Sequence, residues 1–185
     1  MNVFNTILVL ATAFLAVFGE TVFTAPHYLL GAQVDLLPAL MIYAALNTNV
    51  VSVSILAVAG GLWFDALSAN PLGATVLPLF AVGFPICVQR DFILRELPFA
   101  QVFLGALASA LVPAITILIL LSGGNQPLLG WSSLWQWIVM TAGGAAATPI
   151  FFALFDWCNH AFGYQLQTES SFRPDREIHR DKKAK

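Results

Sequence analysis

Residues 34–67 form an almost continuous apolar stretch, VDLLPALMIYAALNTNVVSVSILAVAGGLWFDAL. As a single helix it would measure roughly 51 Å at 1.5 Å per residue, whereas the hydrocarbon core of a bilayer is about 30 Å thick. The polar triplet Asn47-Thr48-Asn49 lies near its middle and has the residue types of a tight turn. The stretch therefore predicts two short helices, 34–47 and 49–67, joined by a hairpin.

The composition argues against a water-soluble fold. Of the 185 residues, 58% are apolar and 10% are charged, whereas soluble domains carry about 25% charged residues. Six of the eight basic residues lie in the last thirteen positions, so that Arg90 and Arg95 are the only basic residues among the first 172. Two basic side chains cannot cover a soluble surface of that size, and the chain is interpreted as an integral membrane protein.

The other apolar runs complete a predicted all-α bundle of about six transmembrane helices within residues 1–163. The expected spans, each judged against the ~20 residues that cross a bilayer, are 3–23, 34–47, 49–67, 71–88, 98–121 and 133–162. At the fourth span, Asn70 is a candidate N-cap and Pro71 the first helical residue. Residues 164–185 are polar and mixed in charge, and they predict a disordered cytoplasmic tail.

The positive charges predict the orientation of the chain. Basic residues favour the cytoplasmic side of a membrane, and here they occur only in the loop after span four and in the tail. The topology determinants are Arg90, Arg95, Arg173, Arg176 and Arg180. With six spans, both termini are cytoplasmic. With five spans, in which 34–67 is one helix, the N-terminus lies outside, and charge alone does not distinguish the two.

Four acidic residues lie in or beside the predicted spans, where ionisable groups are costly and are candidates for function. Asp65 is near the C-terminal end of a helix, where the macrodipole disfavours an anion. It is expected to hydrogen-bond groups around residues 68–70 and brace that turn, or to face a partner or ligand. Asp35 is expected to cap the second span, and Glu20 and Asp156 to be solvated at the membrane interface.

Small residues on the last two spans predict close contacts between helices. Gly105, Ser109 and Pro113 recur every four residues in the fifth span, and the sixth span contains GGAAAT at 143–148. Helices in lipid associate through small residues because these let the backbones approach. Packing within the chain is the favoured interpretation, and contact with a partner's helix is the alternative.

No set of residues at a readable spacing predicts catalysis, metal binding or a cofactor. Cys87 and Cys158 lie in apolar runs, where a free cysteine behaves as a small hydrophobe, and neither a CxxC nor an HExxH pattern occurs. A hydrolase or transferase would need a nucleophile and a base in reach of each other, or converging metal ligands. We therefore expect no enzymatic activity.

Residues 60–73 read GGLWFDALSANPLG, in which glycine and leucine precede an aspartate, a small polar turn and then Leu-Gly. This segment resembles the most recognisable part of the bacterial rod shape-determining protein MreD family. VDLLP at 34–38 resembles that family's entry into its second span, and Pro149 and the short basic tail also agree. The candidate residues for partner binding or for a structural motif are Asp35, Gly60, Gly61, Asp65, Asn70, Pro71 and Gly73.

The resemblance implies a non-enzymatic scaffold of the cell-wall elongation complex in the bacterial inner membrane. The partners it implies are membrane lipids, the periplasmic scaffold protein MreC and, directly or indirectly, MreB filaments and the wall-synthesis glycosyltransferase and transpeptidase, with no nucleic acid. It also implies a fold similar to the six-helix substrate-binding subunits of vitamin (ECF-type) transporters. The alternative function is such a subunit, with a pocket lined by Asp65, Trp63 and Asn70. A lipid-modifying enzyme ranks third because a catalytic set is missing.

Overall fold

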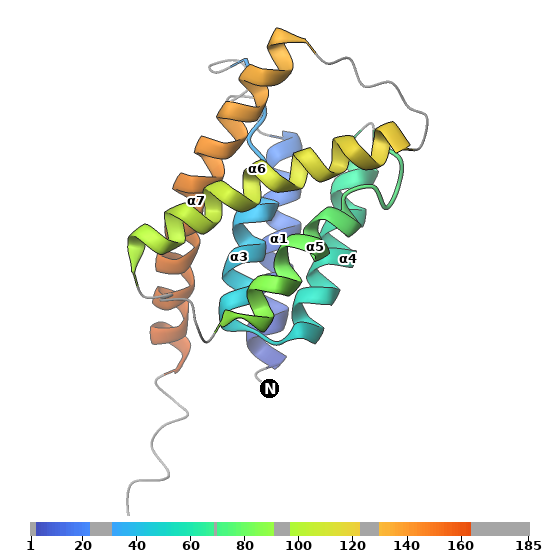
Figure 1. Cartoon of the computed structure of the whole chain (residues 1–185). Helices are drawn as coiled ribbons and strands as arrows, with labels where there is room; N and C mark the ends of the chain where they lie inside the picture. Colours follow the sequence, from blue (N-terminus) through green and yellow to red (C-terminus); the bar gives the residue numbers. More distant parts are fainter. Residues whose placement is uncertain (1–2, 23–30, 69, 91–96, 123–129, 164–185) are drawn as a thin grey trace, which may run out of the picture. The chain divides into compact units, whose positions relative to one another are not determined.

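Six helices and no strands make up the part of the chain that the computed structural model describes, residues 3–22, 31–68, 70–90, 97–122 and 130–163 (Figure 1). In chain order the helices are α1 (Val3–Val22), α3 (Leu37–Asn47), α4 (Val50–Leu67), α5 (Val76–Val88), α6 (Pro98–Ser122) and α7 (Trp131–Gly163). The chain divides into two units, Met1–Phe152 and Ala153–Lys185. The packing described here lies within the first unit.

Four of the six described helices, α1, α4, α6 and α7, are long and apolar enough to span a bilayer. The other two are shorter, because α3 has 11 residues and α5 has 13, which correspond to roughly 17 and 20 Å. Large apolar side chains are exposed on all four long helices, among them Leu15, Val58, Phe103 and Ile138. The architecture agrees with the predicted all-α membrane protein.

The predicted hairpin at residues 47–49 is confirmed. α3 ends at Asn47, Thr48 follows in extended backbone conformation, and Asn49 precedes α4 in the same conformation. The amide and the hydroxyl of Thr48 both donate to the Ala44 carbonyl oxygen, at 2.8 and 2.7 Å. The last turn of α3 therefore closes at the polar triplet, and α4 returns in the opposite direction (Figure 1).

α1 and α4 lie side by side and run in the same direction. Near their beginnings, the hydroxyl oxygens of Thr6 and Ser52 are 2.8 Å apart. Further along both helices, the rings of Phe14 and Trp63 meet edge to face, with centroids 5.3 Å apart. The C-terminal ends of α1 and α4 therefore share one end of the bundle with the beginning of α3, which runs antiparallel to α4.

α3 is the centre of the bundle. Its residues 37–46 are all buried, and it contacts α1, α4, α5 and α6. Two glycines let neighbours approach it, since a Cβ on Gly60 would lie 3.1 Å from Leu37 and one on Gly83 would lie 3.0 Å from Met41. A helix buried on all sides has no polar face. Both ends of α3 make polar contacts with other parts of the chain.

The fourth predicted span begins later than expected. α5 starts at Val76 and not at Pro71, and its N-cap is Thr75 and not Asn70. The turn before it contains Gly73, whose φ is +92°. An α-helix cannot include this backbone conformation, which glycine adopts without steric cost. The helix therefore begins only after the turn is complete.

α6 and the middle of α7 cross through small residues. A Cβ on Gly105 would collide with the Thr148 side chain and the Gly144 carbonyl oxygen, and a Cβ on Gly144 would collide with Ser109. The backbones approach this closely because these positions carry almost no side chain. The small residues predicted to make helix contacts therefore pack within the chain. α6 also contacts α3 and α5, which it crosses in Figure 1.

Candidate functional site

Asp65 is 1% exposed, and both of its carboxylate oxygens accept hydrogen bonds. Oδ2 accepts from the amides of Gly73 (2.8 Å) and Thr75 (3.0 Å), and Oδ1 accepts from the Thr75 hydroxyl. These donors replace the water that burial removes from the carboxylate. Asp65 thus braces the turn that follows α4, as one of the two interpretations of the sequence expected. The Ser68 hydroxyl donates to its carbonyl oxygen at 3.4 Å, whereas the partners of its carboxylate lie beyond residues 68–70.

The position of Asp65 between two helices explains how the anion is tolerated. It lies near the C-terminal end of α4, where the macrodipole disfavours negative charge. Its partners are the residues just before α5, where unpaired N–H groups and the opposite end of a dipole favour it. Since both oxygens are engaged, the carboxylate joins the end of α4 to the start of α5 and does not face an open site.

Gly61 determines how closely α4 and α5 approach. A Cβ at this position would lie 2.9 Å from the backbone of Val76, the first residue of α5. Gly60, one position earlier, faces Leu37 of α3 instead. The two adjacent glycines of the motif therefore bring α4 against both short helices.

The remaining motif residues close the turn. The Asn70 amide donates to Ser68 Oγ at 3.4 Å, and the Ala74 amide donates to the Pro71 carbonyl oxygen at 3.1 Å. Pro71 is exposed, and Leu72 is 72% exposed. The segment is thus a turn that is held by polar contacts inside and presents an apolar tip.

Two carboxylates meet the beginning of the buried helix α3. Glu20 Oε1 accepts from the Leu36 amide at 2.6 Å, and Asp35 Oδ1 accepts from the Leu37 amide at 2.9 Å. Amides of a first helical turn have no partner within the helix, and anions stabilise that end. Asp35, which is 4% exposed, accepts from the amide of the first helical residue, as expected of a carboxyl group at this end, but the N-cap of α3 is Leu36.

The expectation that Glu20 is solvated at the interface is wrong. Its Oε2 is buried and has no hydrogen-bond partner among the described residues, while its Oε1 accepts from the Leu36 amide at the start of α3. The physical reason is that α1 ends beside the start of α3, so the carboxylate is drawn to that helix's unpaired amides. Asp156, by contrast, is exposed.

The other end of α3 receives a positive charge. Arg90 Nη1 donates to the Thr48 carbonyl oxygen at 2.6 Å, and Cys87 Sγ lies 3.9 Å from the same oxygen. Thr48 is the C-cap of α3, where helix carbonyl groups lack internal partners. α3 therefore meets carboxyl groups at its N-terminal end and a guanidinium group at its C-terminal end. Arg90 was predicted only as a topology determinant, and its partner lies 42 positions earlier in the chain.

A pair of glutamines holds the segment that leads into α3. Gln136 Oε1 accepts from the Gln33 amide at 3.0 Å, and Gln136 Nε2 donates to the Gln33 carbonyl oxygen at 2.8 Å. One side chain thus gives both backbone groups of Gln33 a partner. Sequence reasoning missed this contact, and the only signal for it is a single amide between Trp135 and Trp137 in an apolar helix.

Several of the predicted topology determinants cannot be placed relative to these contacts. Arg95, Arg173, Arg176, Arg180 and the tail at 164–185 lie outside the described residues. Within the residues that are described, no group of three or more His, Cys, Asp or Glu side chains could hold a metal ion.

Comparisons of the chain with models of protein families, with curated proteins and with solved structures find no match. The function is therefore inferred from the residues and their geometry.

Proposed function

We propose that this chain is a non-enzymatic membrane scaffold of the bacterial cell-wall elongation complex. The proposal rests on the resemblance of residues 60–73 to the MreD family and on the role of these residues in packing α4 against α5. Asp65 turns its carboxylate inward to hold a turn, and Gly61 brings α4 against α5. A protein that works through contact surfaces needs its shape maintained in this way.

The closed turn after α4 is the observation that carries the proposal. Three donors converge on Asp65, and the tip of the turn presents Pro71 and Leu72 on the surface. A preordered apolar tip offers a partner a contact that costs little conformational entropy on binding. We expect MreC to contact this tip, and MreB filaments and the wall-synthesis enzymes to be reached directly or through MreC.

The proposed topology has six passes and both termini in the cytoplasm of the bacterial cell. Arg90 lies at the end of the bundle that holds the 47–49 hairpin, and Asp65 lies at the opposite end. Basic residues favour the cytoplasmic side, which makes the tip at Leu72 periplasmic. α3 and α5 then cross as short helices, because irregular backbone beside them is tolerated where protein surrounds it.

Cysteine labelling tests this topology. Leu72→Cys and Asn49→Cys are introduced separately into a chain whose native Cys87 and Cys158 are replaced by alanine. A membrane-impermeant maleimide added to intact cells with a permeabilised outer membrane should label position 72 and spare position 49. The reverse pattern would invert the topology and remove the proposed contact with MreC.

Depletion and crosslinking in a rod-shaped cell test the function. Depletion of the chain should make the cells round, and a photo-crosslinking residue at Leu72 should trap MreC. The same residue at Ile55, an exposed position on the lipid-facing side of α4, is the matched control and should not trap it. Normal rods after depletion would refute the scaffold role.

The alternative, a substrate-binding subunit of a vitamin-type transporter, is less well supported. It assigns Asp65 to a ligand pocket, whereas the carboxylate oxygens are engaged by Gly73 and Thr75. Titration of the purified protein with thiamine, riboflavin and biotin separates the two functions. Tight stoichiometric binding of one vitamin would favour the carrier, and its absence favours the scaffold.

A further inference from the structure

The carboxyl groups of Glu20 and Asp35 meet at the N-terminal end of α3. The Leu36 amide donates to Glu20 Oε1 at 2.6 Å, and the next amide, that of Leu37, donates to Asp35 Oδ1 at 2.9 Å. Because consecutive amides hold one oxygen of each group, the two groups lie within electrostatic range of each other. Asp35 is almost fully buried. Two acidic side chains therefore share a place from which water is largely excluded.

The second carboxyl oxygen of Glu20 has no partner in this arrangement. Oε2 exposes less than 1 Å² of its surface, and none of the described residues hydrogen-bonds it. An ionised carboxyl group can only accept hydrogen bonds, so an oxygen buried in this way would make a carboxylate costly. A protonated carboxyl group has an O–H donor instead, and the carboxylate of Asp35 is an acceptor. A proton on Glu20 therefore supplies what the oxygen lacks.

The charges of the surrounding elements also favour one proton on the pair. The ionisable side chains of the described elements packed here are Glu20 of α1, Asp35, Tyr43 of α3, Asp65 of α4 and Cys87 of α5, with none in α6 or in α7 before Ala153. None of these is basic, and Arg90 bonds the opposite end of α3. The α3 dipole supplies about half a positive charge, which compensates one carboxylate better than two.

The segment before α3 is held by α7. Gln136 bonds both backbone groups of Gln33, at 3.0 and 2.8 Å. A Cβ on Gly143 would lie 2.5 Å from the Val34 side chain, so Val34 packs directly against α7. Asp35, the next residue, is therefore placed by contacts that do not involve α1.

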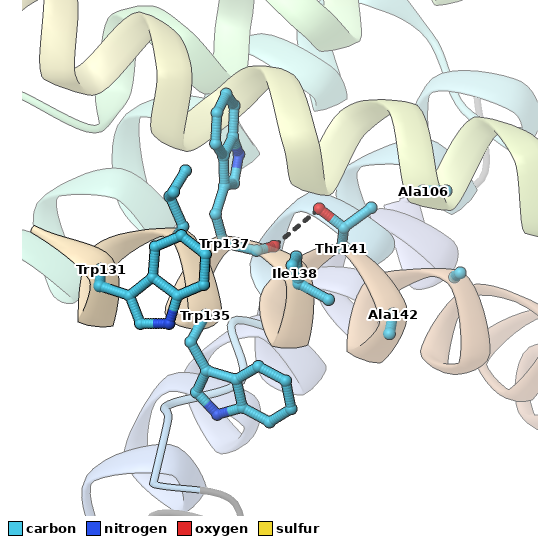
Figure 2. A pocket seen from close by; sticks show the side chains of 9 residues that line it. Ala106, Trp131, Trp135, Trp137, Ile138, Thr141 and Ala142 are labelled. Carbon is cyan, nitrogen blue, oxygen red and sulfur yellow. Dashed lines mark hydrogen bonds between the residues drawn. The ribbon is translucent and has the colours of Figure 1, made fainter.

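α7 is itself held by α6 at this level. The indole of Trp137, the neighbour of Gln136, points toward α6 in Figure 2, and its Nε1 donates to the Ala110 carbonyl oxygen at 2.9 Å. Glu20, by contrast, comes from α1, which contacts α3 and α4. The two carboxyl groups thus belong to separately supported parts of the bundle, and their interaction connects the end of α1 to the start of α3.

We propose that Glu20 and Asp35 form a site that binds one proton, in which Oε2–H of Glu20 donates to the carboxylate of Asp35. Release of this proton to water breaks the O–H bond and leaves two carboxylates, which repel each other in a medium of low dielectric constant. The end of α1 then loosens from α3, while Asp35 stays with α7. The site is independent of the proposed scaffold function, because it is measured on the purified chain.

Infrared spectroscopy of the full-length protein in detergent detects the proton. At neutral pH the parent chain should show a carboxylic acid C=O band that is absent from Glu20→Gln, whose amide replaces the O–H donor. The band should also be absent from Asp35→Asn, because the remaining Glu20 carboxylate accepts from the new amide and from Leu36. Asp156→Asn, at an exposed position, should retain it. Lack of the band in the parent chain would overturn the proposal, and its persistence in Asp35→Asn would show that Glu20 holds the proton without its neighbour.

Isotope labelling gives the same information without a substitution, and it decides the question if Asp35→Asn does not fold. Labelling the glutamate carboxyl groups of the parent chain with carbon-13 should shift the band to lower frequency. Labelling the aspartate carboxyl groups should leave the band in place, since the proton resides on Glu20. A shift on aspartate labelling alone would assign the proton to a different residue and overturn the proposal.

Hydrogen exchange tests the loosening of α1. The parent chain and Glu20→Gln are compared at the same alkaline pH, so that the pH dependence of exchange itself cancels. The last amides of α1 should exchange about tenfold faster in the parent chain, which has lost the hydrogen bond that the glutamine keeps. The amides of α6 should exchange equally in both. Equal exchange at the end of α1 would show that the proton does not hold this helix.

A third variant tests whether another group causes the pH dependence. His27 lies outside the described residues and is the ionisable side chain nearest to Glu20 in the sequence. His27→Gln should leave the infrared band in place and the exchange of α1 at alkaline pH unchanged. A loss of either in His27→Gln would assign the effect to the histidine and overturn the two-carboxyl site.

Discussion

Asp65 and Ser109 are equally buried, each with 1% of its surface exposed, but they belong to regions that are stabilised in different ways. In the turn between α4 and α5, Asp65 accepts three hydrogen bonds. At the crossing of α6 and α7, the Ser109 hydroxyl has no hydrogen-bond partner among the described residues and lies against Gly144. Asp65 stabilises its region through hydrogen bonds to its carboxylate. Ser109 stabilises its region because its small side chain lets two helices approach closely.

The difference follows from where helices end. α3 and α5 are short, and both ends of α3 meet ionisable side chains, Glu20 and Asp35 at one end and Arg90 at the other. Unpaired N–H and C=O groups at buried helix ends must find partners. α6 and α7 have 25 and 33 residues and cross far from their ends, where backbone groups are already paired. Polar side chains are therefore concentrated at the ends of short helices, and small residues where long helices cross.

Removal of the Asp65 carboxylate should have the largest effect on stability. Asp65→Ala leaves three donors without an acceptor, two of them buried, and we expect the free energy of unfolding to fall by about 3 kcal/mol or more. Unfolding in detergent with increasing SDS, followed by circular dichroism, measures it. Asp156→Ala removes an exposed carboxylate and should change stability by less than about 0.5 kcal/mol. Equal stability of the two variants would show that the turn does not depend on Asp65.

Enlarging a glycine at the crossing of α6 and α7 should be the next most damaging change. Gly105→Ala forces a methyl group against Thr148 and should cost about 1–3 kcal/mol. Gly19→Ala on α1 meets nothing within 4 Å and should stabilise its helix by up to about 1 kcal/mol. The same substitution thus has opposite signs at the two sites. A stabilising Gly105→Ala would mean that the helices do not approach through this residue.

Loss of the cation at the end of α3 should have an intermediate effect. Arg90→Ala removes the donor to the Thr48 carbonyl oxygen and should cost about 1–2 kcal/mol. Hydrogen exchange should speed up at the last amides of α3 and remain unchanged in α6. Arg90→Lys keeps the positive charge and should lose less stability than Arg90→Ala. If both variants lose the same amount, the guanidinium geometry matters and the charge does not.

Replacement of Ser109 should have the smallest effect and provides the sharpest test of the contrast. Ser109→Ala removes a buried hydroxyl that has no partner, so stability should change by less than about 0.5 kcal/mol or rise slightly. Ser109→Leu should cost about 1–3 kcal/mol, because it is forced against Gly144. A loss of more than about 1 kcal/mol in Ser109→Ala would place Ser109 in the same class as Asp65.

The boundaries of several helices could be read from the amino-acid sequence. The predicted spans 3–23 and 98–121 agree with α1 (Val3–Val22) and α6 (Pro98–Ser122) to within one residue, and the hairpin at 47–49 was placed correctly. The start of α5 was misplaced at Pro71, although proline is a common first helical residue. Gly73 and the bonds that Asp65 draws from the turn delay the helix, and neither is visible in hydropathy.

Hydropathy, turn residues and the length of each apolar run were sufficient to recognise a helical membrane protein and to divide residues 34–67, because each is a property of neighbouring residues. The partners of the helix ends are not such a property. Arg90 meets Thr48 across 42 positions, and Gln136 meets Gln33 across 103. These contacts and the inward turn of Glu20 arise only when particular helices become neighbours, since a buried N–H or C=O group is satisfied by whichever polar side chain the packing brings to it.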